Sequence, residues 1–465
     1  MFKKRNTLDP VNDGNIPNSY KNARFACIKL RCDFALAQFY KCKELEMKYT
    51  LSLTTSLLLV LMAFGHPASA ATYEVSIRPQ KQEKYKSAKY RLWLPDGIKN
   101  IRAIIVRQHG CGRHGLDHAN DLQWQALATR HHCALLGTDY LTKKACSDWF
   151  EPSNGSNRAF LTALKNLAAQ SERPEIATVP WVLWGHSGGA LWAMNMADRH
   201  PRRVLGVFAR SMAIVDINPK ALDIPMILNY GEREKKGRFQ RVHQKSMESF
   251  SKNRPKGALW AIAVDPKSSH DCRNSRHLAI PFFDAILAEH TRKPNKASDS
   301  QRWRTKGWIG LANNTFDISP RTKLEKLPKL SHWLPNKAVA MAWQEYCKTG
   351  EVRDKTPPPV PTKLTANLES GQVKLNWAAD IDLESGIKFF HVLRNGKKIA
   401  TVGGMKTKGN RNGHFQIRNY GDEPEPTNPT MTFVDPKGQM GQTYQVIAEN
   451  YAGLFSKKSQ AVNAK

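Results

Sequence analysis

Acidic residues are scarce in this chain of 465 residues, which has 40 Asp and Glu against 71 Lys and Arg and a formal net charge of +31. The basic excess is spread along the chain and forms no long Lys/Arg block. No helix-turn-helix, RNA-binding or zinc-finger pattern accompanies it, so the charge does not predict nucleic-acid binding. It is typical of a solvated basic surface, and an anionic polymer outside the cytoplasm, such as a polysaccharide, is the alternative partner.

Cysteine is also sparse, with eight residues in the whole chain. The five cysteines after residue 70 form no CxxC pair and no Cys/His spacing typical of a zinc site. We therefore expect no metal and no organic cofactor. An odd number of cysteines predicts one or two disulfides and a leftover thiol in an oxidising compartment; these residues are Cys111, Cys133, Cys146, Cys272 and Cys347.

Long hydrophobic runs are missing too. The most apolar segment, residues 47–70, begins with "MK", continues with an apolar centre of about 15 residues and ends in "ASA". A bilayer span needs about 20 apolar residues, so this segment predicts a signal peptide cleaved after Ala70 and a secreted or periplasmic protein without a stable membrane span. A membrane anchor with a cytoplasmic tail is the alternative. Residues 1–46 would then be a spurious N-terminal extension.

What the chain does contain, over residues 71–290, is an alternation of short apolar runs with longer amphipathic stretches. Eight runs, from "EVSIRP" to "LWAIAVDP", are expected to be strands. Helices are expected at 121–132, 156–170, 188–200, 237–253 and 276–290. Continuously apolar strands that alternate with helices predict a three-layer α/β domain with a mostly parallel eight-stranded sheet.

Residues 291–356 are basic and only weakly periodic, with one expected helix at about 336–348. They carry four tryptophans, which predict an extension packed against the preceding domain; a lid that contacts substrate is the alternative. The tryptophans are Trp303, Trp308, Trp333 and Trp343. The proline-rich stretch "DKTPPPVPTK" then predicts a stiff linker.

Residues 357–465 contain short strand-like runs separated by turn signals, among them the hairpin signal "RNGKK". This pattern predicts a C-terminal β-sandwich. The segment resembles a fibronectin type III domain, because Trp377 and Tyr444 fall where that family has its core tryptophan and its late-strand tyrosine. The resemblance implies a module that binds or spaces.

The stretch "GHSGG", residues 185–189, has the form G-x-S-x-G. It follows the apolar run "VPWVLW" and precedes a stretch with helical spacing, which is the strand–turn–helix context of a nucleophilic serine. We therefore predict that Ser187 is a nucleophile.

A serine needs a base to accept its proton. His270 is expected on a loop between the last strand and a helix, which is the position of the base in this architecture, whereas His277 falls inside the helix. A third group must hold the imidazole in the right tautomer. Glu234 matches the third position after the glycine that ends the preceding strand, while the nearby Glu232 and the earlier Asp223 remain alternatives.

The oxyanion that forms during such a reaction needs amide donors. The amide of Gly188, directly after the nucleophile, is the first candidate. The loop "HGCG", residues 109–112, should supply the second, with the Cys111 amide preferred and the Gly110 amide as the alternative.

With these pieces in place, residues 71–290 resemble the α/β-hydrolases, in particular the secreted branch that includes polyhydroxybutyrate depolymerases and feruloyl and acetyl xylan esterases. "HGCG", "CSDWF", "GHSGG" and "SSHDC" carry the resemblance. It implies hydrolysis of esters on polymers. The glutamate at the acid position departs from many members, and no cysteine adjoins Ser187. Cys272 could pair with Cys111 instead, or simply pack.

The sequence thus predicts a secreted serine esterase with a Ser187–His270–Glu234 triad, acting on an ester-bearing polymer or a small ester, with Trp149 as a candidate substrate contact or core residue. A serine peptidase of the same fold, or a non-catalytic extracellular protein that binds polyanions or mediates adhesion, are the alternatives.

Overall fold

The computed structural model describes residues 70–292, 303, 305–311, 313, 315–323, 328, 330–404, 406 and 413–465. The predicted N-terminal extension and nearly all of the predicted signal peptide lie outside these residues. Among the described helices, none is long and apolar enough to cross a membrane.

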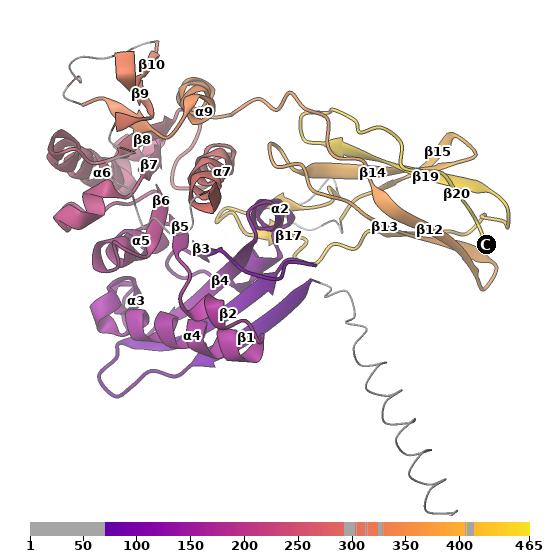
Figure 1. The fold of residues 1–465 in the computed structure, drawn as a ribbon, viewed down its shortest axis with the longest axis horizontal. Coiled ribbons are helices and arrows are strands. Elements are labelled where there is room, and N and C mark those ends of the chain that lie inside the picture. The colour runs from indigo at the N-terminus through magenta and orange to yellow at the C-terminus, as the bar shows by residue number, and fades with distance from the viewer. Residues whose placement is uncertain are drawn as a thin grey trace, which may run out of the picture. The chain divides into compact units, whose positions relative to one another are not determined.

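An eight-stranded sheet forms the centre of the first domain (Figure 1). Its strand order is β1-β2-β4-β3-β5-β6-β7-β8. The first two strands pair antiparallel, and β3 to β8 run parallel to one another. The strand bounds are β1 Ala71–Ile77, β2 Tyr85–Leu94, β3 Ala103–Gln108, β4 Cys133–Thr142, β5 Trp181–His186, β6 Val204–Arg210, β7 Met226–Gly231 and β8 Trp260–Asp265. This topology matches the α/β-hydrolase fold.

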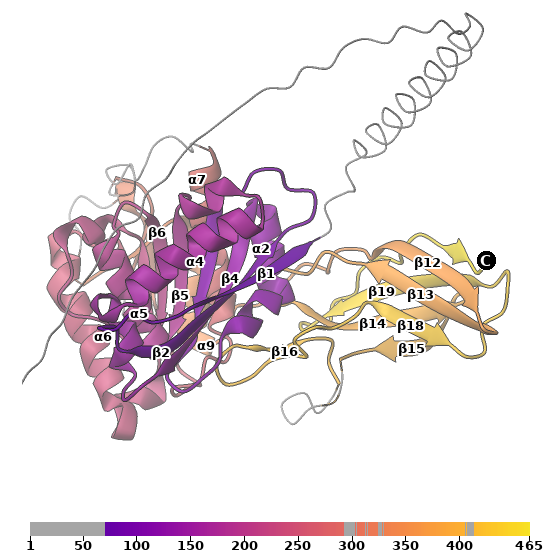
Figure 2. The same cartoon turned by 90° about the horizontal axis from the view of Figure 1, so that it is seen from below.

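Helices cover both faces of the sheet, as continuously apolar parallel strands require. On one face α4, α5 and α6 pack against the strands, and on the other face α2 and α7 do so. Figure 2 shows α4 and α5 lying across the strands. The helix bounds are α2 Leu122–Arg130, α3 Ser147–Phe150, α4 Ser156–Gln170, α5 Gly188–Arg199, α6 Gln240–Asn253 and α7 Arg276–Arg292. The eight expected strands and the five expected helices are confirmed.

The basic extension adds a three-stranded antiparallel sheet of β9 Trp308–Gly310, β10 Ile318–Pro320 and β11 His332–Leu334, followed by α9 Lys337–Thr349. Trp343 is buried, and its indole N–H donates to the carbonyl oxygen of Ile262 in β8 over 2.7 Å. Trp333 is buried against Trp303. These contacts support packing of the extension against the first domain rather than a lid.

The C-terminal residues form two antiparallel sheets around a shared core (Figure 2). One sheet has the order β12-β13-β18 and the other β15-β14-β19-β20. The predicted hairpin turn is present, with positive φ values at Asn395 and Gly396 between β14 and β15. The bounds are β12 Thr362–Glu369, β13 Gln372–Ala378, β14 Ile387–Arg394, β15 Lys397–Val402, β16 Ile417–Arg418, β17 Pro424–Glu425, β18 Thr432–Asp435, β19 Thr443–Asn450 and β20 Val462–Asn463.

Candidate active site

Ser187 occupies the sharp turn between β5 and α5. Its backbone has φ 56° and ψ −116°, a strained conformation for a residue with a side chain. Glycine is required on both sides of the turn, because a Cβ on Gly185 would lie 2.1 Å from the carbonyl oxygen of Gly189. The serine amide donates to the carbonyl oxygen of Arg210 over 2.7 Å, which fixes the turn to the neighbouring strand β6.

A chain of hydrogen bonds joins Ser187 to His270 and His270 to Glu234. His270 lies on the loop between β8 and α7, and its Nε2 is 2.9 Å from the Oγ of Ser187. Its Nδ1 is 2.5 Å from the Oε1 of Glu234. With Nδ1–H donating to the carboxylate, Nε2 is free to accept the serine proton. His277, the weaker sequence candidate, lies in α7.

The structure places Glu234, and not Glu232, on the imidazole. Glu234 is fully buried after β7, and its second oxygen accepts hydrogen bonds from the Ser211 hydroxyl at 2.9 Å and the Gly231 amide at 2.8 Å. Glu232 is exposed and forms an ion pair with Lys235. Asp223 precedes β7 and so lies at the opposite end of that strand.

Arg210 is a positioning residue that the sequence did not reveal. Fully buried at the end of β6, it donates to the Ser268 hydroxyl at 2.8 Å, to the Ser269 carbonyl at 2.9 Å and to the Asp271 carbonyl. These bonds hold the loop that carries His270 from both sides. The one available signal was a charged residue at the end of an otherwise apolar buried strand.

Two rings hold His270 in place. Phe239 stacks on the imidazole with centroids 4.1 Å apart and planes 1° apart. His186, next to the nucleophile, donates from Nε2 to the carbonyl oxygen of His270 over 2.7 Å. Burial lowers the pKa of His186 to about 3, and the positive charge that His270 can carry acts in the same direction. The neutral His186 therefore adds no fixed charge beside the serine.

The loop after β3 approaches the serine from the other side. A Cβ on Gly110 would lie 3.4 Å from the Cβ of Ser187, so this backbone passes close to the nucleophile. His109 fixes the loop, since its Nδ1 is 2.6 Å from the Gly110 carbonyl oxygen and its Nε2 accepts from the Tyr140 amide. The amide of Gly188, in the first turn of α5, has no acceptor within its helix. The Gly188 amide directly follows Ser187 in the chain, and the backbone of Gly110, which precedes Cys111, passes beside the serine.

A disulfide joins Cys111 to Cys146 beside this pair of amides. A Cβ on Gly188 would lie 2.5 Å from the Sγ of Cys111 and 2.7 Å from the Sγ of Cys146. The bridge therefore packs directly against the residue that follows the nucleophile. The suggested pairing of Cys111 with Cys272 is wrong, because Cys272 is a fully buried free thiol.

Breaking this disulfide is expected to affect both stability and rate. It closes a loop with a sequence separation of 35 residues, which corresponds to about 3 to 4 kcal/mol of stability. In a Cys111→Ser/Cys146→Ser variant, the free energy of unfolding measured with urea should fall by that amount. Its kcat should fall about tenfold, because the Cys111 amide is no longer held. A reductant should act on the wild type but leave the variant unchanged; equal kcat values in the two proteins would contradict a role for the bridge in the site.

Trp149 is a core residue, which is one of the two roles that the sequence left open for it. The side chain is fully buried, stacks on Tyr140 with centroids 5.6 Å apart and packs against His109. Its apolar surface is buried against the loop that follows β3. Trp149 of the "DWF" segment therefore packs behind the loop that follows β3. Phe239 is the aromatic residue that stacks on His270.

Four buried imidazoles make the folded protein sensitive to acid. Burial lowers the pKa of His109 to about 4 and the pKa values of His186 and His332 to about 3, and it lowers the pKa of His118 well below its usual value. In the unfolded chain, each imidazole titrates near a pKa of about 6.5. The stability from these neutral rings is therefore complete above that pH and is lost as the pH falls toward the folded-state pKa values.

Two carboxyl groups act in the opposite direction, since burial raises the pKa of Asp382 to about 6 and that of Glu384 to about 7. The lowered imidazoles outnumber these two carboxyl groups, so near pH 5.5 the unfolded state should bind more protons than the folded state, and the free energy of unfolding should rise with pH with a positive slope. Urea unfolding between pH 5 and pH 7 measures this slope. A stability that stays level over that range would contradict the burial of neutral imidazoles.

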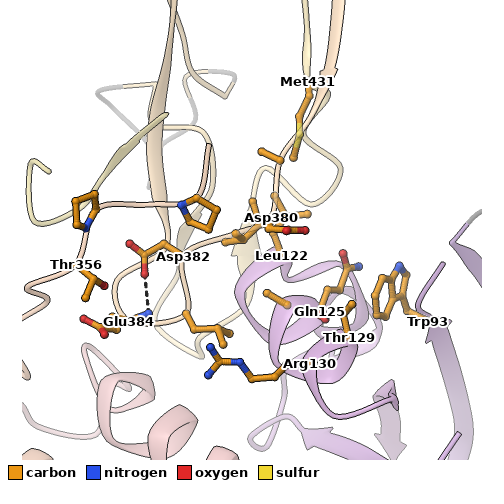
Figure 3. A pocket seen from close by; sticks show the side chains of 16 residues that line it. Trp93, Leu122, Gln125, Thr129, Arg130, Thr356, Asp380, Asp382, Glu384 and Met431 are labelled. Carbon is orange, nitrogen blue, oxygen red and sulfur yellow. Dashed lines mark hydrogen bonds between the residues drawn. The ribbon is translucent and has the colours of Figure 1, made fainter. Parts of the chain in front are cut away.

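A hollow of about 700 Å³ lies away from the triad (Figure 3). Residues of α2, including Leu122 and Arg130, form one wall, and residues of the C-terminal part of the chain, including Asp382 and Met431, form the other. No triad side chain lines it. Among the described residues, no cluster of three His, Cys, Asp or Glu side chains could hold a metal ion.

Comparison with known proteins gives only distant similarities. No family model and no curated protein matches the chain. An S-formylglutathione hydrolase from Agrobacterium tumefaciens is 12% identical with a TM-score of 0.33 over 49% of this chain and 97% of that one. A thermostable carboxyl esterase from Bacillus coagulans is 13% identical with a TM-score of 0.32 over 47% of this chain and 97% of that one.

A family 28 exopolygalacturonase from Yersinia enterocolitica matches a shorter stretch, with 17% identity and a TM-score of 0.17 over 23% of this chain; the match spans 20% of that protein. Similarities at this level carry no conclusion about function. The α/β-hydrolase architecture follows from the strand order and the helices on both faces of the sheet.

Proposed function

We propose that this protein is a serine hydrolase that cleaves carboxylic esters through an acyl-enzyme intermediate, with Ser187 as nucleophile, His270 as general base and acid, and Glu234 as the group that orients His270. The observation that carries the proposal is the continuous hydrogen-bonded chain from the serine oxygen to the buried carboxylate. A strained serine on a strand–helix turn gives the second line of support.

In the first half-reaction, the Oγ of Ser187 attacks the ester carbonyl carbon while Nε2 of His270 takes its proton. The carbonyl oxygen becomes an oxyanion within reach of the Gly188 and Cys111 amides. The C–O bond to the alcohol then breaks, and His270 protonates the leaving oxygen. In the second half-reaction, His270 removes a proton from water, the hydroxide attacks the acyl carbon, and the serine leaves with its proton restored.

Burial lets Glu234 perform a role that many such enzymes give to aspartate. Its Oε2 is occupied by the Ser211 hydroxyl and the Gly231 amide, so only Oε1 faces the imidazole. This arrangement fixes the tautomer with a proton on Nδ1 and stabilises the imidazolium that forms in the reaction.

We propose an ester-bearing polymer outside the cytoplasm, such as an acylated polysaccharide, as the substrate. Two exposed arginines support an anionic polymer as the substrate. Arg113 follows the loop after β3, and Arg238 lies over the Phe239 ring that stacks on His270. The net charge of +31 acts in the same direction. Hydrolysis of an anionic acetylated polymer should then slow as salt rises, whereas that of a neutral one should not.

The C-terminal sheets support assignment of a fibronectin type III-like module. Trp377 and Tyr444 both lie in the shared core, and the Tyr444 hydroxyl donates to Asp435 over 2.8 Å. The disulfide between Cys111 and Cys146 supports an oxidising location, consistent with the proposed secretion or periplasmic export.

A matched pair of substrates separates the esterase from the peptidase and from the non-catalytic alternative. p-Nitrophenyl acetate and p-nitroacetanilide share the acetyl group and the p-nitrophenyl ring and differ in the atom of the scissile bond. An esterase should turn over the ester and show no measurable turnover of the anilide. Measurable cleavage of the anilide would favour a peptidase, and no turnover of either by folded protein would leave a binding function.

A further inference from the structure

We propose that the hairpin at residues 416–426 of the C-terminal module is part of the active site, and that Tyr420 at its tip is a specificity-determining residue for esters that carry a flat ring. The proposal rests on the proposed function, because it names the side chain that would form one wall of that same site. It also makes the C-terminal module a component of the catalytic unit rather than a spacer.

The hairpin is built to hold one conformation. Strands β16 and β17 pair antiparallel, and Asn419 closes the turn between them. Its side-chain oxygen accepts hydrogen bonds from the backbone amides of Gly421 at 2.9 Å and Glu423 at 3.2 Å. Its own backbone amide donates to the Glu423 carbonyl oxygen over 2.9 Å. Asp422 has a φ of 64° within this turn. Tyr420 therefore projects from a closed turn.

A buried ion network anchors the turn to the first domain. The Asp422 side chain is fully buried and accepts from Arg107 and, at 2.9 Å, from Arg276. Both arginines also bind Asp121 at the start of α2. Arg418 lies 3.8 Å from the Asp422 carboxylate, so the network contains three positive and two negative charges. Arg107 lies between the Trp124 and Trp184 rings, 4.6 Å from each centroid.

Burial by itself would raise the pKa of Asp121, but the charges of Arg276 and Arg107 outweigh it and hold that pKa below its usual value. The carboxylate is therefore ionised, as a paired buried charge must be. The network fixes the hairpin to Arg107 in β3 and to Arg276 at the N-terminus of α7, and both arginines bind Asp121 at the N-terminus of α2. The side-chain oxygen of Gln416 adds a third contact by accepting from the Leu122 amide over 2.8 Å.

The turn reaches the loop that carries the proposed general base. The carbonyl oxygen of Tyr420 accepts from the Cys272 amide over 3.0 Å, and Cys272 is two residues after His270. Arg418 donates to the side chain of Asn274 at 3.4 Å in the same loop. The hairpin thus contacts the part of the loop after His270, and the buried Arg210 donates to Ser268 and Ser269 before it.

The Tyr420 ring lies close to the residue that precedes Ser187. It meets the ring of His186, the neighbour of Ser187, with centroids 5.8 Å apart, and the guanidinium of Arg113 lies 5.4 Å from its centroid. The side chain nevertheless stays 42% exposed. A large ring that is held by two neighbours and still open to solvent offers a stacking surface. Burial raises the pKa of Tyr420, so the phenol is neutral.

Phe239, in the short helix Gly237–Phe239 before α6, stacks on His270. Two aromatic rings from distant segments, each with an arginine over it, therefore border the proposed triad. Flat rings, either aromatic or the faces of sugars, are the groups that such surfaces bind. A small aliphatic ester has nothing to place against Tyr420, so its hydrolysis should not depend on that ring.

The test compares Tyr420→Ala, Tyr420→Phe and the wild type as full-length proteins with three esters: ethyl acetate, phenyl acetate and ethyl benzoate. Tyr420→Ala should lower kcat/KM about tenfold for at least one ester that carries a ring, mainly through KM, and leave ethyl acetate within twofold. Tyr420→Phe keeps the ring and the backbone contact, so it should match the wild type. Phe455→Ala, an aromatic that is 55% exposed on the same module, is the matched control.

A fluorophosphonate labelling rate, measured in parallel on each protein, separates this proposal from the proposed function. If the folded wild type is not labelled and hydrolyses none of the esters, the proposed function fails and the hairpin has no catalytic site to complete. If the wild type is active but Tyr420→Ala behaves like Phe455→Ala with all three esters, or loses the same factor with each of them, the specificity role of Tyr420 is overturned.

Discussion

Replacement of Ser187 with alanine is expected to lower kcat/KM for ester hydrolysis by a factor on the order of 10⁵ to 10⁶ and to leave the fold intact. The alanine lacks the oxygen that attacks the ester, while the turn itself is held by the serine amide and by the flanking glycines. Hydrolysis of p-nitrophenyl acetate by the two proteins measures the loss, and their thermal unfolding shows whether both are folded.

The other two members of the triad should follow in a defined order. His270→Ala should cost about as much as Ser187→Ala, because each removes the same proton-transfer unit, and the double variant should lose no more than either single one. Glu234→Gln should cost about 10⁴-fold through the wrong imidazole tautomer. Glu232→Gln is the matched control, since that carboxylate is exposed and pairs with Lys235. Equal losses for the two glutamates would contradict the assignment of Glu234.

Replacement of Asp422 with alanine is expected to destabilise the protein by about 3 to 5 kcal/mol, because it leaves the buried Arg107 and Arg276 with a single carboxylate between them. Urea unfolding measures this loss. Asp380→Ala, which removes an exposed acid from the same module, should change stability by less than about 0.5 kcal/mol. If the two variants unfold alike, the network does not couple the module to the first domain.

The features that the sequence predicted are local in the chain. The nucleophile turn needs only the five residues of "GHSGG" between an apolar run and a helical stretch, and the structure has both. The position of His270 follows from the order of strands and helices, which periodicity reveals. The sequence favoured Glu234 by its position after the strand but left Glu232 open, because the two residues share one turn and only tertiary packing determines which of them is buried.

The features that the sequence missed depend on contacts between distant segments. Phe239 reaches His270 from 31 positions earlier in the chain, and Tyr420 reaches the same loop from another module. No periodicity or spacing signals such contacts. The suggested pairing of Cys111 with Cys272 failed for the same reason, and the sequence could not decide between the two roles of Trp149, since proximity to a site residue in sequence does not show which side chains the fold buries.

The most direct test of the central claim is the mass of the purified protein after reaction with a fluorophosphonate, followed by identification of the modified peptide. A serine hydrolase with this site predicts one covalent adduct, located on Ser187 and absent from Ser187→Ala. An adduct that persists in the variant, or a folded wild-type protein that forms none, would contradict the account.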